Sequence, residues 1–503
     1  MQEKWLSFKS GTDVRGTALY CKPNKVAQLT DEAVDKIAKG FCVFLKKKLN
    51  KEKIRVALGY DSRLSARRIE NAFLNACLLS GIDVIKTGLS STPAMFMITQ
   101  DESLNVDASC MITASHLPQD KNGLKFFTRD GGLDGKDIVE ILTYAQNGEE
   151  VKGLGKTESV DYMKKYAQIL VDYVKGKTGE EKPLQNLKIV VDAGNGAGGF
   201  YAYDVLKVLG ADISGSQFLN PDGNFPNHIP NPENKGAMRS VCDRVREVGA
   251  DFGIIFDTDV DRAGAVDCTG EEINRNRLIA LISAILIEEQ PGACIVTDSV
   301  TSDGLTEFIE SKGGVHYRFK RGYKNVIDES KRLNGEGVYS PLAIETSGHA
   351  AFKENYFLDD GAYLVTRLIV KLVELKKQGK TFGDVLSGLK MPKESAEIRM
   401  KLDDSIDFKE YGLSLLEKLE EYARNKDDFD LCENSFEGVR VSFKAKEGDG
   451  FFLLRMSLHE PIMPLNIESN KIGGTIKIAE KLYEFLKDYD KLNIGSLKNF
   501  LNK

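Results

Sequence analysis

Three short polar segments of the chain combine residue types that could carry out chemistry. The first lies within Cys110–Pro118, where an apolar run ends at Thr113 and continues directly into Ser115 and His116. The apolar run predicts a buried strand, the small residues after it predict a loop, and Pro118 cannot continue a strand. A serine presented in this way could be a nucleophile, although a hydroxyl that caps a turn beside a surface histidine would give the same pattern.

The second segment carries three aspartates at alternate positions, Asp257, Asp259 and Asp261. We expect this segment to be extended, so that the three carboxylates point to one side. Carboxylates that lie close together repel one another unless a cation lies between them, and Mg²⁺ prefers hard oxygen ligands. An EF-hand loop is excluded, because the positions that require Gly and Glu are occupied by Arg262 and Cys268. A solvated acidic turn remains the alternative.

The third segment, Glu345–His349, offers a carboxylate, the hydroxyl of Ser347 and an imidazole that could bind sugar hydroxyls or move protons. Lys320 lies in a basic stretch, while Arg455 and Ser457 place a guanidinium and a hydroxyl where a phosphate could bind. A polar turn, a solvated basic face and an ordinary strand end are the respective alternatives. Taken together, the segments fit phosphoryl transfer, in which positioning and charge neutralisation provide most of the catalysis.

A glycine-rich segment, Gly194–Gly199, satisfies the pattern G-x-G-x-x-G after a predicted strand. It suggests an NAD(P)-dependent dehydrogenase as a distant alternative function. The acidic residue that a dinucleotide site needs about twenty residues later is not evident, because the next predicted strand runs into Ser214 and Ser216. A tight turn from strand to helix would explain the glycines without any cofactor.

The polar segments must be positioned by a strand–helix–strand pattern that occurs three times. We expect strands at 56–60, 82–85 and 110–113 in the first repeat, 188–192, 211–214 and 253–256 in the second, and 294–298, 315–319 and 339–344 in the third. Such units form parallel strands with right-handed crossovers, and ligands bind beyond the carboxyl ends of the strands. The three polar segments all follow the last strand of a repeat, which a set of unrelated surface loops would not predict.

After about Met391 the pattern changes to that of an antiparallel α+β domain, with strands at 395–401, 438–443 and 450–456 and helices at 409–425 and 474–489. The length of 503 residues allows three or four domains. The net charge of −6, with dispersed Lys and Arg, argues against nucleic acid or an anionic membrane as a partner. The eight cysteines form no C-x-x-C pair, so we expect reduced thiols, no zinc site and a cytoplasmic protein.

The segments Thr113–Pro118, Asp257–Arg262, Glu345–His349 and Arg455–Ser457 resemble, in this order, those of the α-D-phosphohexomutases, the phosphomannomutase/phosphoglucomutase superfamily. The resemblance covers nearly the whole chain and includes Pro221–His228. It implies an α/β protein with four domains around a central cleft: three similar mixed-sheet α/β/α domains and an α+β C-terminal domain. The implied boundaries are 1–155 with the active-site serine, 156–274 with the metal-binding loop, 275–390 with the sugar-binding loop and 391–503 with the phosphate-binding loop.

The resemblance also implies a reaction. A hexose 1-phosphate and a hexose 6-phosphate, of mannose, glucose or both, would interconvert through a phosphoserine and a hexose 1,6-bisphosphate intermediate. Mg²⁺ would be bound by Ser115, Asp257, Asp259 and Asp261. The implied catalytic residues are Ser115, His116, Lys125 and Arg15, and the implied substrate-binding residues are Arg262, Lys320, Glu345, Ser347, His349, Arg455, Ser457 and His459. We expect a monomer or a weak homodimer whose partners are the hexose phosphate and the bisphosphate.

Three residues depart from the family pattern. Leu117 stands where the family commonly has Asn, and Leu458 and His459 replace a small or amide residue and a Thr in the phosphate-binding loop. These departures concern phosphate affinity and the choice of substrate. They keep open two alternatives, a phosphoglucosamine mutase and a non-catalytic relative that binds sugar phosphates.

Overall fold

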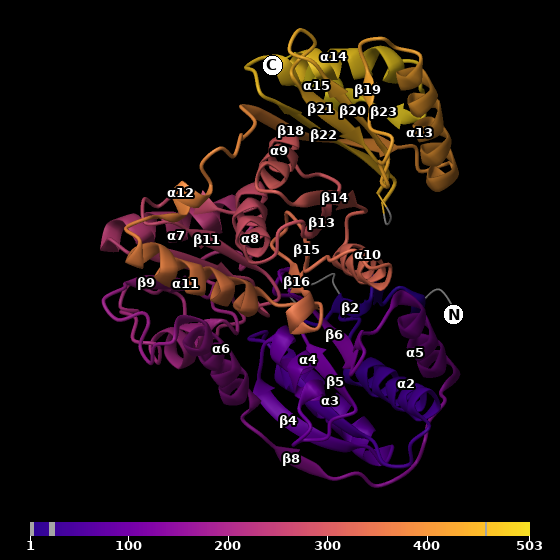
Figure 1. Ribbon diagram of the computed structural model, residues 1–503. Helices are drawn as coiled ribbons and strands as arrows, with labels where there is room; N and C mark the ends of the chain where they lie inside the picture. The colour runs from indigo at the N-terminus through magenta and orange to yellow at the C-terminus, as the bar shows by residue number, and fades with distance from the viewer. Residues whose placement is uncertain (1–4, 20–25, 458–459, 503) are drawn as a thin grey trace. The chain divides into compact units, whose positions relative to one another are not determined.

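The computed structural model describes residues 5–19, 26–457 and 460–502. The chain forms two compact units, each made of more than one stretch: unit 1 comprises residues 1–274 and 347–383, and unit 2 comprises residues 275–346 and 384–503. In Figure 1 the colour follows the chain, so the late, orange segment of unit 1 is visible beside its early, purple and magenta elements. Among the described residues, no helix is both long and apolar enough to cross a membrane.

The first sheet of unit 1 is mixed. Its strands are β1 (Lys9–Ser10), β2 (Asp13–Thr17), β3 (Arg55–Tyr60), β4 (Asp83–Leu89), β5 (Ala108–Ile112), β6 (Lys121–Thr128), β7 (Gly131–Gly132) and β8 (Thr157–Ser159). They lie in the order β1-β2-β6-β5-β3-β4-β8, with β7 paired to β6. β3 runs parallel to β4 and β5, whereas β6 runs antiparallel to both β5 and β2.

Helices pack on both faces of this sheet. They are α2 (Asp31–Leu49), α3 (Ala66–Leu79), α4 (Thr92–Gln100) and α5 (Gly135–Asn147). α2, α3 and α5 share one apolar core with the strands, in which the rings of Phe41 and Phe126 stack with centroids 4.4 Å apart. α4 contacts β3, β5 and β6 but contributes nothing to that core, so it covers the other face. Thr30 caps the N-terminus of α2. Its hydroxyl accepts the N–H of Ala33, which has no backbone acceptor within the helix.

The second sheet of unit 1 carries the acidic segment. Its strands, in the order β12-β11-β10-β9, are β9 (Ile189–Asp192), β10 (Phe252–Phe256), β11 (Ala263–Val266) and β12 (Glu272–Ile273). β10 is parallel to β9 and antiparallel to β11, so the residues between β10 and β11 form a hairpin turn. The remaining elements of unit 1 are α6 (Tyr162–Thr178), the π-helix η1 (Tyr201–Leu206), α7 (Lys235–Val248), β16 (Ala350–Phe352), η2 (Lys353–Asn355), β17 (Leu358–Asp359) and α11 (Gly361–Lys377).

The strand expected at 211–214 does not form, and this expectation was wrong. The segment pairs with the residue before β9 only through an isolated parallel bridge between Asp212 and Lys188. The carboxylate of Asp212 accepts the backbone N–H of Ser214, and such a local hydrogen bond competes with a strand ladder.

In unit 2, residues 275–346 contribute three mutually parallel strands that are flanked by helices. The strands, in the order β14-β13-β15, are β13 (Cys294–Asp298), β14 (Val315–Phe319) and β15 (Leu342–Ile344). The helices are α8 (Asn276–Glu289), α9 (Asp303–Ser311) and α10 (Tyr323–Gly335). The loops that carry Lys320 and Glu345 leave from the carboxyl ends of β14 and β15.

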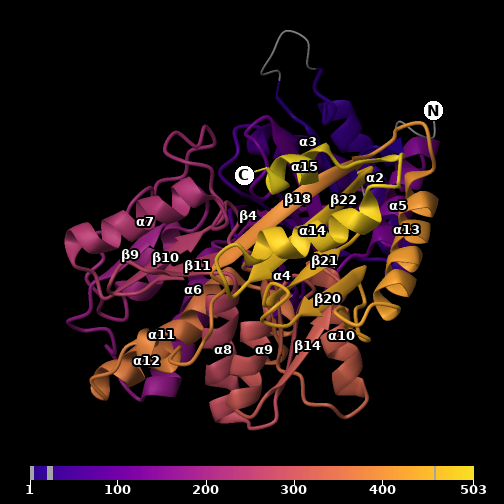
Figure 2. The ribbon, with the colours of Figure 1, turned by 90° about the horizontal axis from the view of Figure 1, so that it is seen from above.

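The C-terminal part of unit 2 is an antiparallel sheet. Its strands, in the order β19-β20-β21-β22-β18-β23, are β18 (Glu394–Leu402), β19 (Asp430–Leu431), β20 (Val439–Phe443), β21 (Gly450–Leu454), β22 (Ile462–Ser469) and β23 (Leu492–Asn493). The helices are α13 (Phe408–Arg424), α14 (Gly474–Leu486) and α15 (Gly495–Leu501), and the single turn α12 (Phe382–Val385) precedes them. Figure 2 shows α13 and α14 along this sheet, with which they share one apolar core.

The expected fold class is confirmed: three mixed-sheet α/β/α domains precede an antiparallel C-terminal sheet domain. The four boundaries inferred from the sequence remain predictions. The polar segments follow β5, β10 and β15, and so leave from the carboxyl ends of buried strands. Backbone donors and acceptors are no longer committed to the ladder at these ends, which makes them available to side chains and ligands.

Candidate active site

Ser115 lies just after β5, in the loop that leads to β6. Its φ of 51° places it in the left-handed region, which costs about 1–3 kcal/mol for a residue other than glycine. The hydroxyl of Thr113 accepts the N–H of Ser115 at 2.8 Å. Ser115 Oγ donates to Asp257 Oδ2 at 2.9 Å. The structure therefore brings together a hydroxyl and a carboxylate that are 142 positions apart in the chain.

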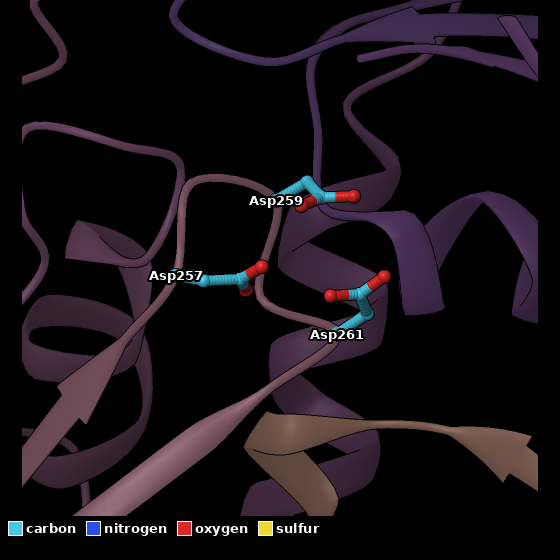
Figure 3. Close-up of side chains that lie close together, drawn as sticks. All are labelled: Asp257, Asp259 and Asp261. Atoms are coloured by element: carbon cyan, nitrogen blue, oxygen red, sulfur yellow. The ribbon is translucent and has the colours of Figure 1, made fainter. Parts of the chain in front are cut away.

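Asp257, Asp259 and Asp261 lie on the turn between β10 and β11, not on an extended segment as expected. Val260, with a φ of 68°, reverses the chain, and the N–H of Val260 donates to the carbonyl of Asp257. Figure 3 shows the three carboxylates gathered on this turn, and one oxygen from each lies within 4.8 Å of the others. They converge because the turn is tight, whereas alternate residues of a strand would share a face but lie about 7 Å apart.

The electrostatics of the turn fit a divalent cation. Burial, together with the charges of Asp261 and Asp259, raises the pKa of Asp257 well above its usual range. Burial acts in the same sense on Asp261, but Lys125 and other cations hold the pKa of that carboxyl well below its usual range. Asp259 Oδ1 and Asp261 Oδ1 are buried without a hydrogen-bond partner. Two orphaned carboxylate oxygens beside a third carboxylate offer the hard oxygen ligands that suit Mg²⁺.

Lys125 and Arg262 supply positive charge to the turn. Lys125, from β6, places Nζ at 3.1 Å from Asp259 and 2.5 Å from Asp261. Burial alone would lower the pKa of Lys125, but these two carboxylates raise it well above its usual range. Arg262 Nη2 lies 3.0 Å from Asp257 Oδ2 and 3.2 Å from Ser115 Oγ. A guanidinium that touches both the serine and its neighbouring carboxylate can stabilise negative charge at that hydroxyl.

His116 and Arg15 flank the same centre. Burial and the nearby Arg262 lower the pKa of His116 to about 3, so the imidazole is neutral at physiological pH. Its Nδ1 lies 2.6 Å from Arg262 Nη2 and accepts from it in that neutral state. Arg15 pairs with Asp13 at 2.8 Å. Burial opposes its charge, but Asp13, followed by Asp259 and Asp261, raises the pKa of Arg15.

The predicted sugar-binding segment is divided between the two units. Ser347 and His349 belong to unit 1, where Ser347 Oγ lies 2.9 Å from His349 Nδ1 and His349 Nε2 lies 3.9 Å from Asp261. Glu345 belongs to unit 2, where its carboxylate accepts the N–H of Gly322 at 2.6 Å. That contact joins the segment to the loop that carries Lys320.

Arg455 and Ser457 lie after β21 in unit 2. Arg455 Nη1 is 3.6 Å from Glu437, and Arg455 Nε is buried without a hydrogen-bond partner. Glu437 also accepts the N–H of Arg321 at 2.9 Å, so it links this loop to the loop of Lys320. His459, expected to bind substrate, lies outside the described residues, as does the departure Leu458.

The glycines of Gly194–Gly199 are explained by close packing of backbone. A Cβ on Gly196 would lie 2.5 Å from the carbonyl oxygen of Thr258, on the acidic turn. A Cβ on Gly199 would lie 2.3 Å from the carbonyl oxygen of Leu219. The segment therefore lets the chain approach the acidic turn, and no cofactor is needed to account for its composition.

Comparison with known proteins identifies the family. Profiles of the phosphoglucomutase/phosphomannomutase α/β/α domains I, II and III match residues 12–152, 161–270 and 274–390. The chain belongs to the phosphoglucomutase/phosphomannomutase family. A phosphomannomutase/phosphoglucomutase of Pseudomonas putida is 30% identical over 427 residues, which cover 85% of this chain and 86% of that protein. A phosphoglucomutase of Neisseria gonorrhoeae is 29% identical over 456 residues, which cover 90% and 92%.

A solved structure supports the same assignment. The crystal structure of a phosphoglucomutase/phosphomannomutase family protein from Burkholderia thailandensis matches with a TM-score of 0.77 and 27% identity, and covers 97% of both chains. The resemblance to the α-D-phosphohexomutases inferred from the sequence is thereby confirmed. Membership places this chain among the phosphohexomutases by family, whereas identities near 30% do not fix its sugar.

Sequence reasoning missed several residues that contact the predicted site residues within each unit. Thr92 donates its hydroxyl to Asp259 Oδ2 at 2.5 Å and its N–H to the carbonyl of Asp259. Arg63 is buried beneath the Ser115 loop, and Glu437 lies beside Arg455. Arg63 could have been suspected, because it follows β3 just as Ser115 follows the parallel strand β5. Thr92 and Glu437 carry no comparable signal, since tertiary contacts alone bring Thr92 to Asp259 and Glu437 to Arg455.

Proposed function

We propose that the protein interconverts hexose 1-phosphates and hexose 6-phosphates of mannose, glucose or both through a phosphoserine at Ser115. In the first half-reaction, a sugar hydroxyl oxygen forms a bond to phosphorus as the bond to Ser115 Oγ breaks, which gives a hexose 1,6-bisphosphate. In the second, Ser115 Oγ takes the other phosphoryl group back from the reoriented bisphosphate. The observation that carries the proposal is the 2.9 Å contact between Ser115 Oγ and Asp257 Oδ2, beside two further buried carboxylates.

In this proposal the residues of unit 1 stabilise charge and move protons. Ser115, Asp257, Asp259 and Asp261 would bind Mg²⁺, which supplies neutralisation of the transferring phosphoryl group. Arg262, within reach of Ser115 Oγ, would stabilise the phosphoserine. Lys125 and Arg15 would stabilise the negative charge that develops on the oxygens of the transferring phosphoryl group. We assign His116 to the catalytic residues on its motif position, where its neutral Nδ1 accepts from Arg262 and lies 3.5 Å from Ser115 Oγ.

Substrate recognition is assigned to a second set of residues. Arg455 has an unpartnered, buried Nε–H and suits the non-reacting phosphate, with the hydroxyl of Ser457 nearby in sequence. Lys320 would contact the ligand, and Glu345 would bind sugar hydroxyls. We assign Ser347, His349 and His459 to sugar or phosphate contacts on their motif positions.

The proposal is tested by a coupled assay on glucose 1-phosphate and mannose 1-phosphate with Mg²⁺ and a bisphosphate primer. Turnover of at least one sugar is expected, and Ser115→Ala should reduce it to near zero because the attacking and accepting oxygen is removed. Ser103→Ala, at an exposed serine of the same unit, should leave the rate unchanged. Unchanged activity in Ser115→Ala would remove Ser115 from its role.

Two alternatives are a phosphoglucosamine mutase and a non-catalytic sugar-phosphate-binding protein, the second of which is motivated by the departures at Leu458 and His459. Comparison of kcat/KM for glucose, mannose and glucosamine 1-phosphates separates the first alternative from the main proposal. Intact mass of freshly purified protein addresses the second, because a non-catalytic relative would carry no phosphate on Ser115.

A further inference from the structure

Arg63 makes an unusual set of contacts with the loop that carries Ser115. Its side chain is fully buried in unit 1, just after β3. Its guanidinium donates to four backbone carbonyls of the loop, those of Ser115 at 2.5 Å, Leu117 at 2.6 Å, Pro118 at 2.9 Å and Lys121 at 2.8 Å. Nη1 and Nη2 each serve two carbonyls, so all four of their hydrogens are directed to one short loop.

Neighbouring groups also hold the guanidinium of Arg63 in position. Asp61 is buried, accepts the backbone N–H of Arg63 at 3.0 Å and lies 3.4 Å from its Nε. The N–H of Asp61 donates to the carbonyl of Ile112, at the end of the strand that leads to Ser115. The ring of Phe225, from the other sheet domain of unit 1, lies 5.5 Å from the guanidinium carbon. Contacts with the protein, at the ends of strands β3 and β5, therefore fix the position of the guanidinium.

The contacts of Arg63 help to hold the backbone of Ser115 in its strained conformation. Ser115 has a positive φ, which a residue with a Cβ adopts only when its surroundings impose it. The hydroxyl of Thr113 binds its N–H, and Arg63 binds its C=O. Both peptide groups of Ser115 are thus hydrogen-bonded, and its Oγ is left to contact Asp257 and Arg262.

We propose that Arg63 is a positioning residue that fixes the Ser115 loop so that Oγ is aligned for phosphoryl transfer. The inference rests on the proposed function for the meaning of that alignment, but the ordering of the loop does not depend on it. A lysine cannot replace Arg63, because one ammonium cannot direct four N–H groups in a planar fork. Misplacement of a reacting atom by about 1 Å can reduce the rate about a hundredfold.

The test compares Arg63→Lys with Arg67→Lys, a matched change four residues further along the chain, at a side chain that is 73% exposed. Arg63→Lys should reduce kcat about tenfold to a hundredfold and change KM less than about twofold, because it touches no residue assigned to substrate recognition. Hydrogen exchange read by mass spectrometry should become faster across residues 114–121 and stay unchanged across β9 and β10. Arg67→Lys should match wild type in all three measurements.

Each outcome decides the proposal. Faster exchange at 114–121 together with a reduced kcat supports it, and unchanged exchange or an unchanged kcat in a folded Arg63→Lys protein overturns it. If Arg63→Lys does not fold, Asp61→Asn, which keeps the shape and removes the anchoring charge, should give the same two effects at smaller size, and normal values would overturn the proposal. If wild type turns over no hexose phosphate, the proposed function fails, and the exchange measurement alone decides whether Arg63 orders the loop.

Discussion

Lys125 and Arg262 together contact all three carboxylates of the acidic turn, yet two carboxylate oxygens have no hydrogen-bond partner. Asp259 Oδ1 and Asp261 Oδ1 remain buried without partners, and an unpaired buried carboxylate oxygen is destabilising. A single divalent cation could contact these oxygens and offset the carboxylate repulsion that, after burial, raises the pKa of Asp257. Metal binding at the turn would therefore stabilise unit 1.

Mg²⁺ should accordingly raise the thermal midpoint of the wild-type protein. Binding to the folded state alone adds about 2.7 kcal/mol at a Mg²⁺ concentration one hundred times Kd. Asp261→Asn should lose most of this stabilisation, while Asp243→Asn, at an exposed site on α7, should retain it. Thermal denaturation with Mg²⁺ and with chelator measures the shift, and an equal shift in both variants would contradict binding at the turn.

At the scale of elements, the long segment before α7 links a buried ion pair to the centre. His228 Nε2 lies 3.0 Å from both oxygens of Asp192, at the end of β9. Further along, Asn231 and Glu233 lie 3.4 Å and 3.9 Å from Arg262 Nη1. The His228–Asp192 pair thus anchors the segment that supports the guanidinium next to Ser115.

This pair should make stability depend on pH in a defined direction. Burial opposes protonation, but the contact with Asp192 raises the pKa of His228 above its ordinary 6.5. The folded state therefore binds the proton more tightly, so the stabilisation is complete below about pH 6.5 and is lost as pH rises through the raised folded-state pKa. His228→Gln should cost about 1.5 kcal/mol near pH 6 and less near pH 9, as measured by urea denaturation. A cost that grows with pH would contradict the assignment.

The sequence predicts elements better than it predicts their contacts. Apolar runs such as Val56–Tyr60 and Cys294–Asp298 are buried strands, because a strand covered on both faces must be apolar throughout. The segment 211–214 fails, because Asp212 closes a local turn that hydropathy cannot reveal. The acidic triad is correctly placed after a strand, but its convergence depends on the turn at Val260. The position of Arg63 after a strand could be predicted, but its four carbonyl partners could not, because they are defined only once the chain has folded.

At the scale of the whole molecule, the two groups of predicted site residues belong to different compact units. Ser115 and the acidic turn are in unit 1, whereas Lys320, Glu345 and Arg455 are in unit 2. The repeats in the sequence do not predict that residues 347–383 return to unit 1, because the repeat pattern is local and this packing is not. Transfer chemistry and phosphate recognition should therefore be separable by mutation.

Arg455→Gln should raise KM for the hexose phosphate about tenfold to a hundredfold, because a charge-assisted contact to phosphate contributes about 1.5–3 kcal/mol. The Mg²⁺-dependent shift in thermal midpoint should stay at the wild-type value, since the acidic turn is in unit 1. Arg424→Gln, at a half-exposed arginine paired with Glu420 and Glu433, serves as the control. Steady-state kinetics and thermal denaturation measure the two effects, and a normal KM would remove Arg455 from the phosphate site.

The interleaving of the chain limits how it can be shortened. α11, most of whose residues are buried, packs against α6 and β11 in unit 1, where Thr366 contacts Tyr201 and Asp360 contacts Tyr166. A stop codon after residue 274 would delete this helix and expose the apolar surfaces that it covers. Such a fragment would retain every residue of the acidic turn and the serine loop, yet it would be prone to aggregation.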